Sequence, residues 1–135
     1  MPRFMMLMIP KEYERGPTAE EAAAMTKFNE ALLRAGVLLA ADGLHSAAKG
    51  ARVTISGGKQ TVTDGPFTEA KELVGGYWMI DVKSKDEAVE WATRCRIGEG
   101  DIIEVRQVAE LSDFPEDVQA VAELSQTPPE QTQAR

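Results

Sequence analysis

Six consecutive apolar residues, Phe4-Met5-Met6-Leu7-Met8-Ile9, stand near the start of the chain. In a β-strand successive side chains point to opposite faces, so Phe4, Met6 and Met8 would lie on one face and the other three on the reverse. A strand that is apolar on both faces is typical of a sheet that is covered on both sides. The run therefore predicts a strand inside a layered fold.

Two capping boxes mark the expected helices, because a Ser or Thr and a Glu three residues later satisfy free backbone donors at a helix start. One box spans residues 18–21 and precedes a helix that Gly36 is placed to end. The other spans residues 84–87 and opens a helix that Gly98 interrupts. Further strands are predicted at residues 37–41, 75–82 and 102–108 from apolar or alternating patterns.

Residues 51–63 predict a β-hairpin, because apolar and polar residues alternate on both sides of Gly57-Gly58, which favours a tight turn. Apart from this insertion the expected order is β-α-β-β-α-β, an α+β arrangement of the ferredoxin-like kind. Both helices would cover one face of a single antiparallel sheet and leave the apolar residues of the other face bare. A second copy is the commonest cover for such a face, so we expect a homodimer.

The composition argues against several classes of function. A chain of 135 residues is long enough for one domain with a proper core. The 22 acidic and 15 basic residues give a net charge of −7, which argues against direct nucleic-acid binding, since phosphates need clustered Lys and Arg. No apolar run approaches the ~18 residues of a membrane span, so we expect no membrane association and a cytoplasmic location. One His and one Cys supply no metal-ligand set, and no phosphate loop is present, so no cofactor is expected.

The composition becomes more polar from Phe114 onward. We expect a domain over residues 1–112 and a C-terminal segment over residues 113–135. A short helix is expected within that segment, and its Gln-rich end, residues 125–135, is expected to be disordered.

Three sequence segments carry a family resemblance. They are Gly50-Ala51-Arg52-Val53, then residues 63–72 around Asp64-Gly65-Pro66-Phe67, and Gly75-Gly76-Tyr77-Trp78 leading to Glu90-Trp91-Ala92 and Glu104-Val105-Arg106. Through these motifs the chain resembles the DGPF-domain family, part of the wider YCII-related group, over roughly residues 2–110.

The resemblance implies a dimeric α/β-barrel built from ferredoxin-like subunits, with residues 1–112 as the YCII-related/DGPF domain. It also implies an association with sigma factors of the extracytoplasmic-function type. The wider group is suspected of enzyme activity that uses a His-Asp pair, with the histidine in the first helix. Here no histidine stands between Thr18 and Ala35, so that assignment does not transfer to this chain.

His45 and Asp64 are the candidate catalytic residues. His45 is the one side chain whose ordinary pKa, about 6.5, suits proton transfer near neutral pH. Asp64 is a carboxylate of the kind that orients a histidine base. The alternatives are an exposed loop histidine and an Asx turn ahead of Gly65-Pro66.

Four further residues are candidates for ligand binding: Lys71, Tyr77, Asp81 and Arg106. Tyr77 and Asp81 share one face of a predicted strand, and Arg106 is placed to pair with Asp81. The alternatives are salt bridges for the charged residues and a core or barrel-lining role for the tyrosine.

Two functions remain open on this basis. The first is a dimeric module without catalysis that binds a small molecule or a protein, linked to sigma-factor-dependent transcription. The alternative is a cofactor-free enzyme that carries out elimination or isomerisation by acid-base chemistry with His45 and Asp64.

Overall fold

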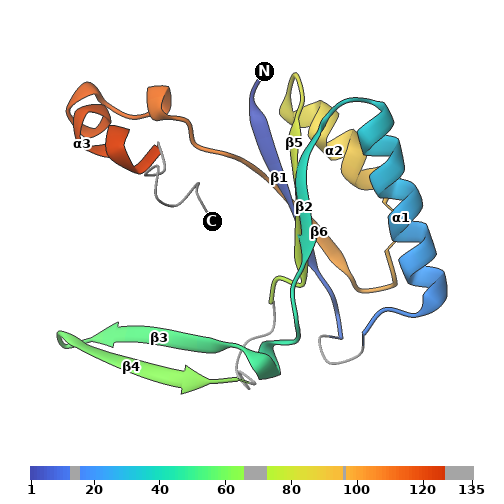
Figure 1. Cartoon of the computed structure of the whole chain (residues 1–135), viewed down its shortest axis with the longest axis horizontal. Helices are drawn as coiled ribbons and strands as arrows, with labels where there is room; N and C mark the ends of the chain where they lie inside the picture. Colours follow the sequence, from blue (N-terminus) through green and yellow to red (C-terminus); the bar gives the residue numbers. More distant parts are fainter. Residues whose placement is uncertain (13–15, 66–72, 96, 127–135) are drawn as a thin grey trace, which may run out of the picture.

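The computed structural model describes residues 1–12, 16–65, 73–95 and 97–126. The chain is an α+β protein, as the sequence predicts, and Figure 1 shows the arrangement of its elements. The strands are β1 (Arg3–Ile9), β2 (Leu38–Gly43), β3 (Ala51–Ser56), β4 (Lys59–Asp64), β5 (Gly76–Asp81) and β6 (Ile102–Gln107). The helices are α1 (Ala19–Arg34), α2 (Lys85–Arg94) and α3 (Glu116–Gln126), with short 3-10 turns η1 (Ala47–Lys49) and η2 (Leu111–Asp113).

Four strands form one sheet in the order β2-β5-β1-β6, and every neighbouring pair is antiparallel. This strand order is compatible with a ferredoxin-like arrangement. The hairpin β3–β4 forms a separate two-stranded sheet, with Val53 opposite Val62 and the turn at Gly57 and Gly58, both at positive φ. Among the described residues the sheet stays open, and no closed barrel forms within the chain.

The helix starts follow the local signals. Thr18 accepts a hydrogen bond from the Glu21 backbone N–H at 3.1 Å, and the Glu21 carboxylate accepts one from the Thr18 N–H at 3.2 Å. At α2 only half of the expected box forms: Ser84 accepts from the Glu87 N–H, while the Glu87 carboxylate accepts from the Lys83 N–H instead. Residue 36 follows α1 at φ +73°, a conformation that glycine adopts without strain.

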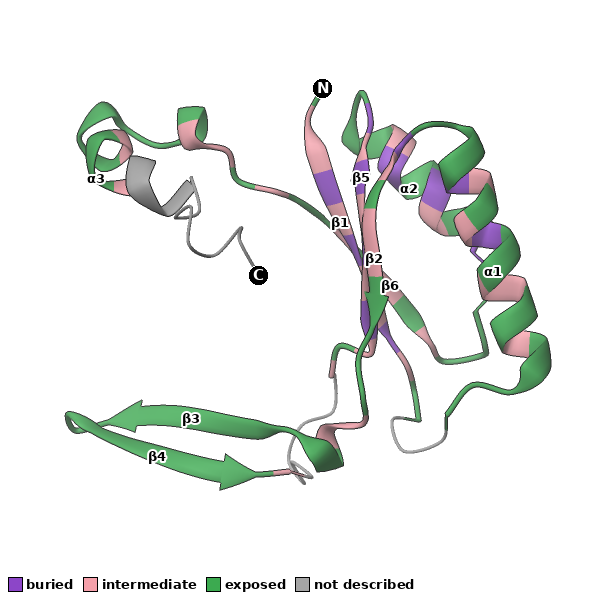
Figure 2. Cartoon of the chain, viewed as in Figure 1, coloured by how far each residue is buried: buried purple, intermediate pink, exposed green. Residues whose placement is uncertain are grey.

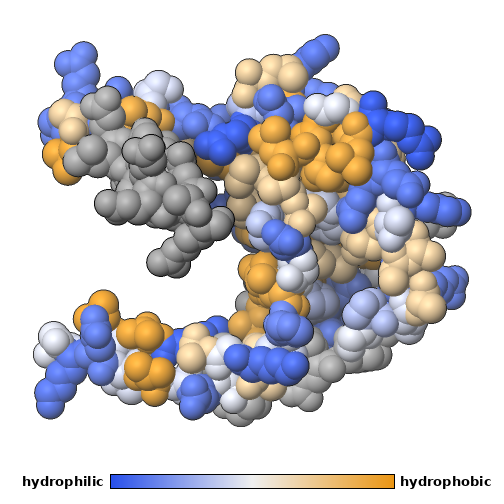
Figure 3. Space-filling model, viewed as in Figure 1, coloured by the Kyte–Doolittle hydropathy of each residue, from blue (hydrophilic) through white to orange (hydrophobic). Residues whose placement is uncertain are grey.

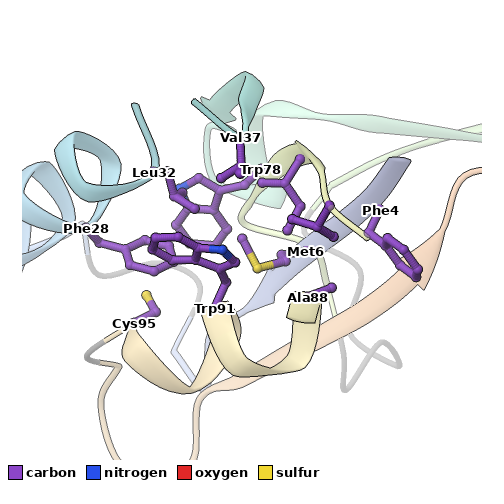
Figure 4. Packing of buried hydrophobic residues seen from close by; sticks show 11 residues of the cluster. Phe4, Met6, Phe28, Leu32, Val37, Trp78, Ala88, Trp91 and Cys95 are labelled. Carbon is purple, nitrogen blue, oxygen red and sulfur yellow. The ribbon is translucent and has the colours of Figure 1, made fainter. Parts of the chain in front are cut away.

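Helices α1 and α2 cover the same face of the sheet, and the core lies between the helices and the sheet (Figures 1 and 4). Phe28 of α1 packs edge-on against Trp78 of β5, with ring centroids 5.3 Å apart. The Trp78 indole N–H donates to Asn29 at 2.7 Å, so the polar atom of this core aromatic is satisfied. The buried core consists of Phe4, Met6, Phe28, Leu32, Val37, Trp78, Ile80, Val82, Ala88, Trp91 and Cys95.

The other face of the sheet carries the side chains that alternate with the core residues. It is made of Arg3, Met5, Leu7, Ala40, Asp42, Tyr77, Met79, Asp81, Glu104 and Arg106. We call this set the open face. Figure 1 shows that neither α1 nor α2 covers it, and that the hairpin and α3 both project on its side.

The C-terminal helix of the structure is α3, which begins two residues after Phe114. The prediction of disorder concerns residues 125–135, of which residues 127–135 lie outside the described part of the chain. Within the described part, no helix combines the length and the apolar character needed to span a membrane.

Candidate functional site

A cleft of about 1280 Å³ lies at the end of the sheet where β1 finishes and β5 begins. Its walls come from the start of α1, the segment that follows β2, and residues 97–101 before β6. These segments are far apart in the sequence, and the antiparallel order of the sheet brings them to one edge. The cleft is large enough for an organic molecule of metabolite size.

Tyr77 and Asp42 form a hydrogen bond between side chains of the cleft lining. They are direct neighbours in the register of β5 and β2, and the Tyr77 hydroxyl donates to Asp42 Oδ2 at 3.0 Å. This hydrogen bond, together with the negative charge of Asp42, raises the pKa of Tyr77 above its ordinary value. The phenol therefore stays protonated well above neutral pH and presents a fixed oxygen beside a carboxylate.

His45 also lines the cleft, in the segment between β2 and η1. The segment is fixed at both sides, because the Leu44 N–H donates to the Gly75 carbonyl at 2.9 Å and Ser46 accepts from the Ala48 N–H at 3.2 Å. The histidine side chain is exposed. Of the candidate residues from the sequence, His45 and Tyr77 are the two that the cleft brings together.

Asp64 ends β4 opposite Ala51 and is exposed outside the cleft lining. Its neighbour Gly65 lies so close to η1 that a Cβ there would overlap the Ala47 carbonyl oxygen, which explains the glycine. The base of the hairpin therefore packs against Ala47, two residues after His45. Within the described ranges, no hydrogen bond or ion pair joins Asp64 to His45.

Two of the remaining candidates lie outside the cleft lining. Asp81 and Arg106 belong to the open face, where Arg106 approaches Glu104 at 3.8 Å rather than Asp81. Asp81 stands opposite Arg3 in the register, and its Oδ1 is buried without a hydrogen-bond partner in the described structure. Lys71 lies outside the described residues.

Sequence reasoning missed Asp42 and Asp101. Asp101 accepts hydrogen bonds from the backbone N–H of Lys11 at 2.7 Å and of Gly98 at 3.0 Å, and so ties two walls of the cleft together. Asp42 is missed because β2 contains an irregularity between Leu38 and Ala40. Leu38 lies on the core face, and strict alternation of side chains along the strand would place Asp42 on that face too. The shift in register places Asp42 on the open face beside Tyr77 instead.

The cleft combines apolar surface with more acidic than basic side chains. Among the described residues that line it, five carry carboxylates, namely Glu12, Glu21, Asp42, Glu99 and Asp101, and two carry ammonium groups, namely Lys11 and Lys49. The apolar part includes Met8, Met25, Ala41, Leu44, Val74 and Ile97. No cluster of three metal-ligating side chains occurs among the residues that the structure describes.

Two comparisons with known proteins show what the chain is similar to. The model of the YCII-related domain matches residues 2–112. A segment of 37 residues is 49% identical to an uncharacterised protein of Rhizobium meliloti (strain 1021), a match that covers 27% of this chain and 30% of the relative. The matched family segment ends before α3 begins.

Proposed function

The chain belongs to the YCII-related domain family, and from this premise we propose that it is a small-molecule-binding module that acts as a homodimer. The observation that carries the binding proposal is the cleft with Tyr77 and Asp42 at its side. An apolar lining with a few fixed polar groups is the usual composition of a ligand site. The hydroxyl and the carboxylate would orient the ligand, while Met8 and Met25 would contact its apolar part.

The charge of the cleft favours one class of ligand. Among the described lining residues, five carboxylates against two ammonium groups disfavour a phosphate or a carboxylate ligand by repulsion. A neutral or cationic amphipathic molecule, with a hydrogen-bond donor that reaches Asp42, suits the site best. His45 lies within the same lining and would add a polar contact at its edge.

The dimer proposal is supported by the apolar surface that the described part of the chain leaves uncovered. Met5, Leu7 and Met79 on the open face keep intermediate exposure, and every residue of the hairpin is exposed. An apolar sheet face that its own chain leaves uncovered is a usual place for a protein partner. A second copy on the open face would cover the apolar side chains of Met5, Leu7 and Met79, and pairing two sheets in this way is also what a dimeric α/β-barrel requires.

A matched pair of cleft variants tests the binding proposal. Ala22 is exposed on α1 and lines the cleft, whereas Ala23 is exposed beside it and does not. A library of small amines and neutral aromatic compounds would be screened by saturation-transfer NMR against Ala22→Trp, Ala23→Trp and the unchanged protein. We expect Ala22→Trp to lose the binding that the other two proteins share. Equal binding to all three would contradict the assignment of the cleft.

The second candidate function is acid-base catalysis, and the position of His45 in the cleft lining favours it. The compounds that bind would be incubated with the protein and followed by NMR for elimination or isomerisation. For a binding module, His45→Ala weakens affinity, Asp64→Asn does not, and no compound is converted. Conversion that both substitutions abolish would establish the enzyme instead. The association with sigma factors stays a prediction from the family resemblance.

A further inference from the structure

The hairpin β3–β4 has one apolar face that the chain itself does not cover. Val53 and Val62 oppose each other in the register, and Ile55 lies two residues along on the same face. These side chains are 61%, 67% and 70% exposed, respectively. Every residue from 51 to 64 is exposed (Figure 2). Because an isolated two-stranded hairpin is marginally stable in water, this element requires a partner surface.

Helix α3 has the complementary properties. Val118 and Val121 are one helical turn apart, and they are 40% and 82% exposed. The helix carries three acidic residues, Glu116, Asp117 and Glu123, and no basic residue. The hairpin carries two basic residues, Arg52 and Lys59, and one acidic residue, Asp64, which ends β4. The two projecting elements therefore combine exposed apolar surface with opposite net charge.

The hairpin and α3 project from opposite ends of the sheet toward the same side (Figure 1), and Figure 3 shows a hollow on that side with the hairpin along its lower edge. Hydrophobic side chains of the hairpin gather along the hollow in that view. A second copy that enters the hollow can be related by a twofold axis along the strands or by one across them. The first axis brings the two hairpins together and the two α3 helices together. The second brings each hairpin against α3 of the other copy.

Charge discriminates between these two arrangements. Pairing α3 with α3 would bring the four carboxylates of Glu116 and Asp117 in the two copies toward one another, and like charges repel over about 8 Å at physiological salt. Arg52 and Lys59 lie on the face of the hairpin opposite Val53 and Val62, while Asp64 lies at its base. When the hairpin pairs with α3, the long stems of the two basic residues allow their charged ends to reach the carboxylates around the edge of the two-stranded ribbon. The same contact also covers Val53, Ile55 and Val62 with Val118 and Val121.

We propose that the apolar face of hairpin β3–β4 is a docking site for helix α3 of a second copy of this chain, so that the two copies are related by an axis across the strands. The contact fixes the orientation of the dimer, and the open face alone does not. This proposal rests on the dimer of the proposed function.

Cysteine cross-linking tests the contact directly. Ile55→Cys places a thiol on the hairpin and Val121→Cys places one on α3, both at exposed positions. The native Cys95 stays in place because it is buried. The two variant proteins are mixed, allowed to exchange subunits, treated with a short bismaleimide and separated on a denaturing gel. The control mixture replaces Val121→Cys by Val89→Cys, an exposed position on α2, behind the other face of the sheet.

The expected result is a cross-linked pair of chains in the Ile55→Cys and Val121→Cys mixture, and little product from the control mixture or from either variant alone. Efficient cross-linking of Ile55→Cys alone would show hairpin against hairpin and would overturn the proposal. Sedimentation of the same samples distinguishes failure of the docking proposal from failure of the dimer proposal. A dimer that gives no cross-link refutes the docking of the hairpin on α3, whereas a monomer refutes the dimer itself.

Charge reversal provides a second measurement on the full chain. Changing Glu116 and Asp117 together to Lys should raise the dissociation constant of the dimer about tenfold, because the substitutions place cations opposite the hairpin. Adding Lys59→Glu to that variant should recover part of the loss. Lys27→Glu, an exposed position on α1, changes the net charge equally and should recover none of it. Equal recovery with both substitutions would contradict specific pairing of the hairpin with α3.

Discussion

The two faces of the sheet differ in what covers their apolar side chains. On the helix side, Met6, Leu32, Ile80 and Val82 are fully buried by other parts of the same chain. On the open side, no residue of the hairpin is buried, and Met5, Leu7 and Met79 keep intermediate exposure. The difference indicates that one half of the molecule is completed by its own helices and the other half by another molecule. Stability should therefore depend on the helix side, and association on the open side.

The largest effect should come from the helix side. Leu32→Ala removes a completely buried side chain, and we expect it to lower the free energy of unfolding by about 2–5 kcal/mol. Leu33→Ala on the same helix is the matched control, because Leu33 is 62% exposed and its loss should cost less than about 0.5 kcal/mol. Urea denaturation at one protein concentration measures both. A similar loss of unfolding free energy in the two variants would show that the buried and exposed sides of α1 do not differ in their contribution to stability.

A charge on the open side should act on association instead. Leu7 lies between Tyr77 and Glu104 in the register, so Leu7→Asp places a carboxylate on the open face with no cation directly opposite. We expect the dissociation constant of the dimer to rise at least about a hundredfold, since an unpaired buried charge is costly. Val89→Asp, on the exposed side of α2, should leave that constant unchanged. Sedimentation equilibrium over a range of concentrations gives both values. Unchanged association of Leu7→Asp would show that the partner does not cover this face.

Cys95 reports on the helix side without any substitution. Burial raises the pKa of its thiol to about 11, against the ordinary 9.0, so the reactive thiolate is about a hundredfold scarcer at pH 8. We expect labelling by a disulfide reagent to be at least that much slower in the native protein than in urea. The free thiol assay follows both reactions in time. Equal rates would mean that the layer between the sheet and α2 opens readily.

The smallest effect concerns the link between β1 and the segment that leads to α3. Arg3 Nε donates to Glu110 at 2.7 Å, and this hydrogen bond lowers the pKa of Glu110 below its ordinary value. A carboxyl group with a lowered pKa in the folded state stabilises the protein above its unfolded pKa of about 4.3, and the contribution is lost as the pH falls through the lower folded value. The melting temperature should therefore drop slightly less between pH 6 and pH 3 in Glu110→Gln than in the unchanged protein. An identical drop would show that this partly buried pair contributes nothing to stability.

Much of the fold could be predicted from the sequence because its signals are local. Capping residues at Thr18 and Ser84 lie within one turn of the helices that they start, and the alternation around Gly57-Gly58 lies within the hairpin itself. The apolar run of β1 also predicted that both faces of the sheet need a cover.

The candidate site was harder to predict because it depends on register between distant strands. One irregularity in β2 moves Asp42 to the face of Tyr77, and nothing near Asp42 in the sequence signals that shift. Asp64 illustrates the same difficulty, since being next to a strand end did not place it in the cleft. The direction in which the hairpin projects depends on tertiary structure, and the alternation of apolar and polar residues along its strands does not specify it.

The mass of the protein in solution shows whether a second copy completes the open side of the sheet. Sedimentation velocity of the full chain at micromolar concentration should give a species of twice the 14.7 kDa chain mass. A single species at the chain mass across that range would show that no second copy covers the open face and the hairpin in solution.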